Sequence, residues 1–248
     1  MTDPATLARA NLMYRRPDLY DQLTTGDEQA AQVASAVAEL AGPVASVLDL
    51  GCGTGRDLDI FRVHYGWDGT GIEFQPELVT YAQLVRPDLN IRLGDMRTVR
   101  LGRKFDLITC LGNSLAYLHT DAELQAAAET FAAHAHANTL LIINTLTAPP
   151  PSGEVMHSTC RIDDADAQVS VAGAWDADSK LHTTHRDWSF PDGSAASDTI
   201  IRRVTPPAEI ARILRAHGFA LVPAGPFVCA VHRRPREADP TPSGGRCP

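Results

Sequence analysis

Three glycines lie within five positions directly after an apolar run, in the stretch VLDLGCGTGRDLDIF of residues 47–61. Gly51, Gly53 and Gly55 stand where a strand would pass into a helix, and glycine there lets a ligand approach the backbone without meeting a Cβ atom. The N–H groups of such a turn and of the following helix point at the ligand. The stretch therefore predicts a small-molecule site at the carboxyl edge of a sheet.

The carboxylate of Asp49 indicates which part of a ligand this turn receives. The glycine spacing is GxGxG rather than the GxGxxG that is typical of pyrophosphate binding. A carboxylate two residues before the first glycine would repel a phosphate and attract a cationic amino group. We therefore expect a nucleoside-bearing cofactor with a cationic group near Asp49, and a dehydrogenase is the weakest alternative.

Side chains suited to a nucleoside follow at the ends of two later expected strands. Gly71-Ile72-Glu73 places a carboxylate roughly 20 residues beyond the glycines, where an acidic side chain usually binds ribose hydroxyls. Gly94-Asp95-Met96 adds a carboxylate for an exocyclic amine and an apolar side chain for the face of a purine. The predicted contacts with an amine, a ribose, an adenine amine and an adenine face are those of Asp49, Glu73, Asp95 and Met96.

The elements that must position these residues alternate along the chain. Apolar periodicity predicts strands over residues 46–50, 69–73, 91–93, 105–111 and 139–146, and helices over residues 28–40, 57–65, 76–85 and 121–135. Parallel neighbours need crossover connections, so this alternation predicts a parallel sheet covered on both faces. A helix over 206–217 and strands over 220–222 and 227–232 would close this doubly wound α/β core.

Residues 154–204 break the alternation. The prolines of TAPPPSG precede them, and turn signals at 176–178 and 191–193 divide the segment into several strands, so we expect an inserted antiparallel β layer. The expected organisation is N-terminal lid helices (1–40), a cofactor-binding core (41–148), the inserted layer that covers the substrate (149–205), the end of the core (206–234) and a disordered tail (235–248).

Composition excludes several classes of function. The chain of 248 residues has a net charge of −8 and no basic stripe, which argues against a nucleic acid partner. Its five cysteines show no CxxC spacing of the kind that zinc sites use, so we expect reduced thiols and a cytoplasmic location. No apolar run reaches about 18 residues and the N-terminus does not resemble a signal peptide, so we expect no membrane association.

Four motifs in this order resemble a known family. DLGCGTG, GIE, GDMR and FDLITCLGNSLAYL are similar to motifs one to four of class I S-adenosylmethionine-dependent methyltransferases. The resemblance implies a seven-stranded Rossmann-like sheet whose last strand is antiparallel, with S-adenosylmethionine as cofactor and S-adenosylhomocysteine as product. The cofactor-binding residues that it implies are Tyr14, Tyr20, Asp49, Gly51, Cys52, Gly53, Glu73, Phe74, Asp95, Met96, Leu111 and Asn113.

Two further stretches narrow the resemblance. DLYD at 18–21 and CLGNSLAYLHTDAEL at 110–124 are similar to actinobacterial enzymes that dimethylate the amine of nucleotide-linked deoxyamino sugars. In that family a Tyr or His at the position of Tyr117 lies beside the acceptor amine, and a Tyr matching Tyr20 closes over the cofactor; Tyr14 is a second candidate for this lid. The chain departs from the family at 144–151, where Asn-Thr-Leu-Thr and three prolines replace an acidic, Trp-rich segment.

The chemistry of methyl transfer limits what the protein must supply. The reaction is an in-line displacement at carbon, so the protein aligns the reactants and excludes water. An amine reacts in its neutral form, so a nearby acceptor of its proton is enough. The resemblance implies a methyltransferase of secondary metabolism, such as antibiotic biosynthesis, that acts on the amine of a small molecule such as a nucleotide-linked amino sugar. The catalytic candidates are Tyr20, Tyr117, His119, His182 and His185.

Several alternatives stay open at this point. The same fold could methylate carbon or oxygen of an aromatic, indole or peptide-derived acceptor, and the departures after Leu146 favour this. The cofactor could instead serve a cyclase or isomerase that transfers no methyl group. A metal site is also conceivable, but alternate residues of a strand face opposite sides, so only His185 and Asp187 would share a face and we expect no metal.

The arginines divide into two groups. Arg97, Arg100 and Arg103 are expected to cap helix and strand ends at the surface, with recognition of a diphosphate as the less favoured alternative. The arginines of the inserted layer are better placed to offer a cation to an anionic acceptor, although half or more of them are expected to be solvated. The layer is also a candidate surface for a homodimer. The arginines of the inserted layer are Arg161, Arg186, Arg202 and Arg203.

Overall fold

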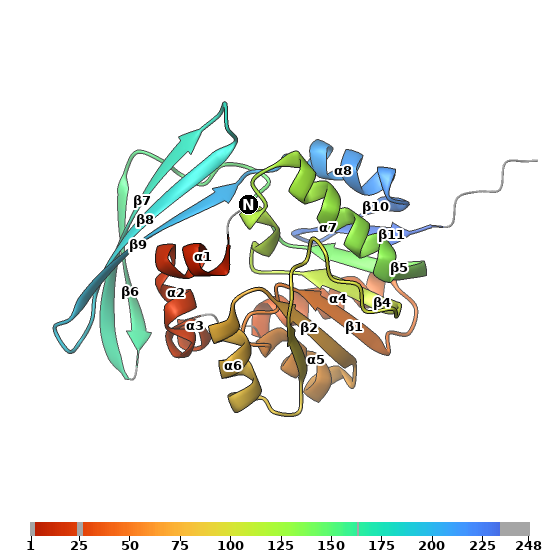
Figure 1. Cartoon of the computed structure of the whole chain (residues 1–248), viewed down its shortest axis with the longest axis horizontal. Helices are drawn as coiled ribbons and strands as arrows, with labels where there is room; N and C mark the ends of the chain where they lie inside the picture. Colours follow the sequence, from red (N-terminus) through yellow and green to blue (C-terminus); the bar gives the residue numbers. More distant parts are fainter. Residues whose placement is uncertain (1–2, 24–26, 163, 234–248) are drawn as a thin grey trace, which may run out of the picture.

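The computed structural model describes residues 3–23, 27–162 and 164–233, so the tail expected over 235–248 lies outside the described residues. The described chain forms a seven-stranded sheet covered by helices, and a four-stranded sheet that lies beside it (Figure 1). Three short N-terminal helices, α1 (Pro4–Ala10), α2 (Leu12–Arg15) and α3 (Pro17–Leu23), lie between the two sheets.

The seven-stranded sheet has the strand order β10-β11-β5-β4-β1-β2-β3. Its strands are β1 (Ser46–Leu50), β2 (Asp68–Glu73), β3 (Asn90–Leu93), β4 (Phe105–Cys110), β5 (Ala135–Ile143), β10 (Phe219–Ala224) and β11 (Phe227–His232). The pairs among β1 to β5 are parallel, whereas β11 is antiparallel to both β5 and β10. The expected Rossmann-like sheet with an antiparallel last strand is confirmed.

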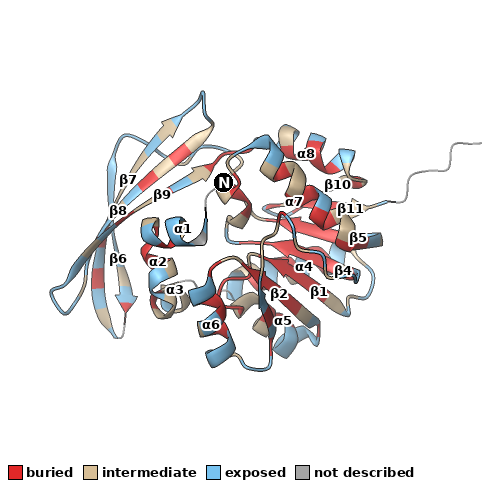
Figure 2. Cartoon of the chain, in the orientation of Figure 1, coloured by how far each residue is buried: buried red, intermediate tan, exposed pale blue. Residues whose placement is uncertain are grey.

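Helices cover both faces of this sheet because alternate strand residues point to opposite sides. Val47 belongs to the core beneath α4 (Asp27–Leu40), α5 (Arg56–Tyr65) and α6 (Pro76–Val85). The next residue, Leu48, belongs to the core beneath α7 (Asp121–His134) and α8 (Pro207–Ala216). Phe61 and Phe131 are fully buried in these two cores, and truncating either to alanine would cost about 3–5 kcal/mol. Figure 2 shows burial concentrated in this sheet.

Most element boundaries agree with the sequence pattern within a few residues, but β5 differs. It was expected over 139–146 and runs from Ala135 to Ile143. The strand starts directly after α7, and its register against β4 shifts between Phe105 and Leu107. Asn138 has a φ of 76° in this stretch, so the chain accommodates the irregularity within the strand.

The inserted segment forms the antiparallel sheet β6-β7-β8-β9. Its strands are β6 (Val155–Ile162), β7 (Ala165–Asp176), β8 (Leu181–Ser189) and β9 (Ala195–Arg203), and the turns lie where the sequence signals them. One face packs Val169 and Trp188 against Leu12, Met13 and Leu19 of the N-terminal helices. The other face and most of β6 are exposed (Figure 2).

The expected lid boundary at residue 40 groups α4 with the N-terminal helices, and the structure separates them. Ala30 and Val33 of α4 are fully buried in the core of the seven-stranded sheet. α1 and α2 contact β9, and α3 contacts β6. No helix in the described part of the chain is long and apolar enough to cross a membrane.

Candidate functional site

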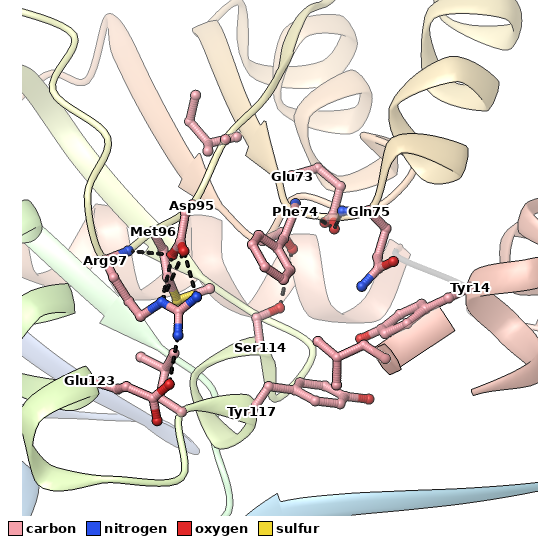
Figure 3. A pocket seen from close by; sticks show the side chains of 15 residues that line it. Tyr14, Glu73, Phe74, Gln75, Asp95, Met96, Arg97, Ser114, Tyr117 and Glu123 are labelled. Carbon is pink, nitrogen blue, oxygen red and sulfur yellow. Dashed lines mark hydrogen bonds and ion pairs between the residues drawn. The ribbon is translucent and has the colours of Figure 1, made fainter. Parts of the chain in front are cut away.

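Three cavities meet at the carboxyl edge of the seven-stranded sheet, and Gly51 lines all of them. The first, of about 70 Å³, lies over the ends of β2 and β3 (Figure 3). The second, of about 310 Å³, lies between α3 and the start of α5. The third, of about 390 Å³, lies between the N-terminal helices and the second sheet. The site is therefore continuous from the sheet edge to the inserted layer.

The glycine turn brings its backbone to the cavity walls with little space to spare. Gly51 has a φ of 86°, and a Cβ atom there would lie 2.5 Å from the Cβ of Ser114. Gly53 has a φ of 57°, and a Cβ atom there would lie 3.0 Å from the hydroxyl of Tyr20. Both positions need a left-handed backbone and lack room for a side chain, which explains why the sequence places glycine at each.

Glu73 presents a carboxylate that backbone groups hold in place. The N–H of Gly53 donates to Oε2 at 2.8 Å, and those of Phe74 and Gln75 donate to Oε1 at 2.7 and 2.8 Å. Burial raises the pKa of this carboxyl, and the three N–H donors oppose that rise. Glu73 lines the first and third cavities, so a hydroxyl-bearing ligand could reach it from either.

Asp49 is 2% exposed and lies in the wall of the second cavity. Its Oδ1 accepts a hydrogen bond of 2.8 Å from the hydroxyl of Thr109. Burial, followed by the nearby carboxylate of Asp57, raises the pKa of Asp49 to about 8. A buried acid with a raised pKa and a carboxylate neighbour is stabilised by a cationic ligand. Cys52 and Leu111 line the same cavity.

Asp95 lies in the wall of the first cavity as part of an ion-pair cluster (Figure 3). The guanidinium of Arg97 donates to its carboxylate at 2.6 to 2.9 Å and to Oε1 of Glu123 at 2.6 Å. Arg97 is only 9% exposed, so the expected role as a surface cap is wrong for this residue. Two carboxylates surround it and keep it in the cavity wall. Met96 and Phe74 also line this cavity.

Three tyrosines cluster where the cavities join. Tyr14 and Tyr117 line the first and third cavities, with ring centroids 5.8 Å apart, and Tyr20 lines the second and third. Burial is the main cause that raises the pKa of Tyr14 and of Tyr20. Both phenols therefore keep their protons at neutral pH and can act as hydrogen-bond donors.

The three candidate histidines lie elsewhere. Nε2 of His119 lies 3.0 Å from the carbonyl oxygen of Ile201, and His182 is buried with Nδ1 3.2 Å from the Thr184 hydroxyl. His185 lies on the opposite, exposed face, 3.2 Å from Asp187. None of the three lines the cavities described above. Within the described ranges, no cluster of three or more metal-ligating side chains is present.

Asn113 also lies outside the linings of these cavities. It precedes the short 3-10 helix η1 (Ser114–Tyr117) with a φ of 63°, so its backbone shapes the turn that carries Ser114 and Tyr117. Ser114 donates to the carbonyl of Gly51 at 3.2 Å. Sequence reasoning placed Tyr117 at the site but did not single out Ser114, although both lie in the run GNSLAYL.

The third cavity receives two arginines from the second sheet, Arg186 and Arg202. Arg186 pairs with Asp198, whereas Arg202 donates at 3.3 Å to the hydroxyl of Thr184 and has no ion pair with any described residue. Arg203, expected to offer a cation to an acceptor, is 4% exposed and pairs with Asp121 and Glu209. That expectation is wrong, because Arg203 ties the second sheet to α7 and α8.

Comparison with known proteins gives a consistent result. The profile described as methyltransferase domain matches residues 26–224. Over 131 residues the chain is 36% identical to dTDP-3-amino-3,4,6-trideoxy-alpha-D-glucopyranose N,N-dimethyltransferase of Streptomyces venezuelae, covering 51% of this chain and 55% of the relative. Over 122 residues it is 37% identical to dTDP-3-amino-3,6-dideoxy-alpha-D-glucopyranose N,N-dimethyltransferase of Streptomyces fradiae, covering 47% and 48%. The chain thus spans about half the length of the curated relatives it matches.

Solved structures share the fold over most of their length. A S-adenosylmethionine-bound amino pentose methyltransferase from Micromonospora echinaspora has a TM-score of 0.75 at 23% identity, covering 91% of this chain and 96% of that protein. Streptomyces venezuelae DesVI has a TM-score of 0.72 at 25% identity, covering 93% and 99%. The resemblance expected from the four motifs is confirmed, and so is the fold class.

Proposed function

The chain belongs to the methyltransferase domain family, and from this premise we propose that it transfers the methyl group of S-adenosylmethionine to the amine of a nucleotide-linked amino sugar. The observation that carries the proposal is the junction at Gly51, where the edge cavity lined by Glu73, Asp95 and Met96 meets a separate cavity beneath the second sheet. The curated relatives named above act on amines of this kind. A role in secondary metabolism, such as antibiotic biosynthesis, goes with this proposal.

The donor half of the site is assigned by charge and shape. Asp49, in the second cavity, would bind the cationic amino group of the cofactor. Glu73 would accept hydrogen bonds from the ribose hydroxyls. Met96 would contact a face of the adenine. Asp95 would accept a hydrogen bond from the exocyclic amine of the adenine while it keeps its ion pair with Arg97. Tyr20 closes this half by covering Gly53.

S-adenosylmethionine supplies an electrophilic methyl carbon when it is bound. The lone pair of the neutral acceptor amine forms the new N–C bond, the C–S bond breaks, and its electron pair goes to sulfur. The protonated product amine then releases a proton to solvent. Tyr117 is the side chain that we assign to the amine, because it lines both the first and third cavities. Its task is to orient the amine, and the enclosed walls exclude water.

The acceptor half of the site is formed by α1–α3 and the second sheet. Trp188, Val169 and Ile200 give the third cavity an apolar wall that suits a deoxygenated sugar ring. Arg202 lines the same cavity with no carboxylate paired to it in the part of the chain that the structure describes. An unbalanced guanidinium favours an anionic group, and a nucleotide-linked sugar carries one in its diphosphate.

A turnover screen tests this proposal. The protein would be incubated with S-adenosylmethionine and nucleotide-linked amino sugars, the same sugars without the nucleotide, indoles and cyclic dipeptides. Both S-adenosylhomocysteine and a mass gain of one methyl group would be detected. Methylation of the nucleotide-linked amine supports the proposal. Methylation of carbon or oxygen only, or turnover without a methylated product, overturns it.

A further inference from the structure

A chain of hydrogen bonds connects the second sheet to η1 through the N-terminal helices. Asp198 on β9 accepts from Arg186 on β8 at 2.8 and 2.5 Å. Nη2 of Arg186 also donates to Oδ1 of Asn11 at 3.1 Å. Nδ2 of Asn11 then donates to the hydroxyl oxygen of Tyr117 at 3.3 Å. These contacts join residues of three separate segments of the chain.

The direction of the last hydrogen bond follows from the chemistry of the other partners. Oδ1 of Asn11 faces Nη2 of Arg186 and also the backbone N–H of Met13, at 3.0 Å. Both groups can only donate, so the amide oxygen must face them. The amide nitrogen must then face Tyr117, and the Tyr117 oxygen must accept. The usual ambiguity in the orientation of an asparagine amide is removed here.

The network is anchored by a buried carboxylate. The side chain of Asp198 is fully buried, and that of Arg186 is 17% exposed. Oδ2 of Asp198 also accepts from the backbone N–H of Leu12 at 2.8 Å. Asn11 itself is 5% exposed, so the protein and not solvent fixes its amide. The anchor therefore holds the junction of α1 and α2 as well as the arginine.

We propose that Asn11 is a positioning residue that sets the place and hydrogen-bond direction of the Tyr117 hydroxyl. The inference rests on the proposed function, which assigns Tyr117 to the acceptor amine. Because one lone pair of the phenol accepts from Asn11, the hydroxyl proton must point toward the cavity or toward its other neighbours. The groups that face the phenol on that side include Tyr14, and Glu73 lines the same two cavities. Arg186 lines the third cavity, so hydrogen bonds through Asn11 connect the wall of this cavity to the Tyr117 hydroxyl.

The substitution Asn11→Asp tests the direction of the hydrogen bond. It keeps the shape of the side chain and the acceptor for Arg186, but it replaces the donor toward Tyr117 by an acceptor. The Tyr117 hydroxyl must then turn and donate. We expect kcat to fall by about tenfold while the Kd for S-adenosylmethionine stays within about twofold. Asn90→Asp is the matched control, because Asn90 is exposed on β3 and, among the described residues, its side chain bonds to the Thr70 hydroxyl and Arg92.

A double-mutant comparison shows whether Asn11 acts through Tyr117. In a Tyr117→Phe background the hydroxyl is absent, so Asn11→Asp should lower kcat by less than about twofold further. An equal loss in both backgrounds would mean that the substitution acts on the structure elsewhere, and the proposal would be rejected.

A spectroscopic readout separates this inference from the proposed reaction. In protein with tyrosine isotope-labelled at Cζ, the resonance that Tyr117→Phe removes belongs to Tyr117. We expect Asn11→Asp to shift this resonance and Asn90→Asp to leave it unchanged. An unmoved Tyr117 resonance overturns the inference whether or not an acceptor has been found. A shifted resonance in a protein that methylates no amine supports the inference and rejects only the proposed acceptor.

Discussion

The Tyr20 hydroxyl lies directly against the glycine turn: a Cβ atom on Gly53 would stand 3.0 Å from it and 3.1 Å from Cε1 of the same ring. Tyr20 belongs to α3 and Gly53 to the loop after β1, so this contact joins the N-terminal helices to the sheet edge. The absence of a side chain at Gly53 is what lets the tyrosine approach. The closure of the site therefore depends on a residue that offers no side chain of its own.

Gly53→Ala should separate these two elements. The new methyl group would displace Tyr20 and would also strain a backbone with a φ of 57°. We expect the Kd for S-adenosylmethionine to rise by about tenfold or more, measured by calorimetry. Gly66→Ala is the matched control, because its φ is 69° but nothing lies within 4 Å of the new Cβ atom. It should lose about 1–2 kcal/mol of folding stability and bind the cofactor normally. Equal binding by both variants would contradict the prediction.

Asp21→Asn should release α3 from the cofactor edge. Asp21 accepts from Arg86 at 3.0 and 3.1 Å and from the Thr54 hydroxyl at 2.5 Å, and the Arg86–Asp21 pair is only 14% and 18% exposed. We expect urea unfolding to show a loss of about 1–3 kcal/mol, together with weaker cofactor binding.

Asp18→Asn provides the control on the same helix. The Arg16–Asp18 pair is 50% and 42% exposed, so its removal should cost less than about 1 kcal/mol. A similar loss for Asp18→Asn and Asp21→Asn would show that the contact of Asp21 with Arg86 and Thr54 does not hold the helix.

The sheet-edge part of the candidate site could be predicted from sequence because its signals are local. The glycine turn, Glu73 and Asp95 each lie at or just after the end of a short strand, and parallel strands bring their carboxyl ends to one edge. The element types and the parallel core of the sheet followed from the same alternation. The packing of α4 against the seven-stranded sheet could not be predicted in this way. An amphipathic pattern shows that a helix buries one face, but it does not show which partner covers that face.

The part of the site between the N-terminal helices and the second sheet could not be predicted because its contacts span long distances along the chain. Asn11 bonds to residues 106 and 175 positions away, and nothing in its own surroundings in the sequence indicates either partner. Arg97 was expected at the surface because Glu123, which holds it in the cavity wall, lies 26 positions away. The histidine candidates were selected by residue type, and the placement of the strands and loops then kept them away from the cavities.

Asp49→Asn should reduce the loss of stability with rising pH in the protein without cofactor. The pKa of Asp49 is about 8 in the folded chain, well above its usual value, so folding favours the protonated form. Wild-type stability should therefore fall as pH rises from about 5 to about 8, and the variant should lose less stability over this range. Thermal unfolding of both proteins at several pH values would measure the difference.

Addition of S-adenosylmethionine should stabilise the wild type more than the Asp49→Asn variant. A cationic amino group beside Asp49 stabilises the carboxylate, so the cofactor should raise the Tm of the wild type by more than that of Asp49→Asn. We expect the Kd of the variant to be weaker by about 10- to 100-fold near neutral pH. An unchanged Kd would place the amino group elsewhere.

Arg202→Gln should weaken binding of the anionic part of the acceptor. Arg202 lines the third cavity and is not balanced by a carboxylate among the described residues, so a phosphate there would gain a charge-assisted hydrogen bond. We expect the Kd for a nucleoside diphosphate, measured by calorimetry, to rise by about tenfold or more. Arg161→Gln is the control, because Arg161 is 65% exposed and pairs with Asp166 at the surface. If both variants bind the diphosphate equally well, the anionic group does not bind at Arg202, and the apolar wall formed by Trp188 and Ile200 would have to select the acceptor instead.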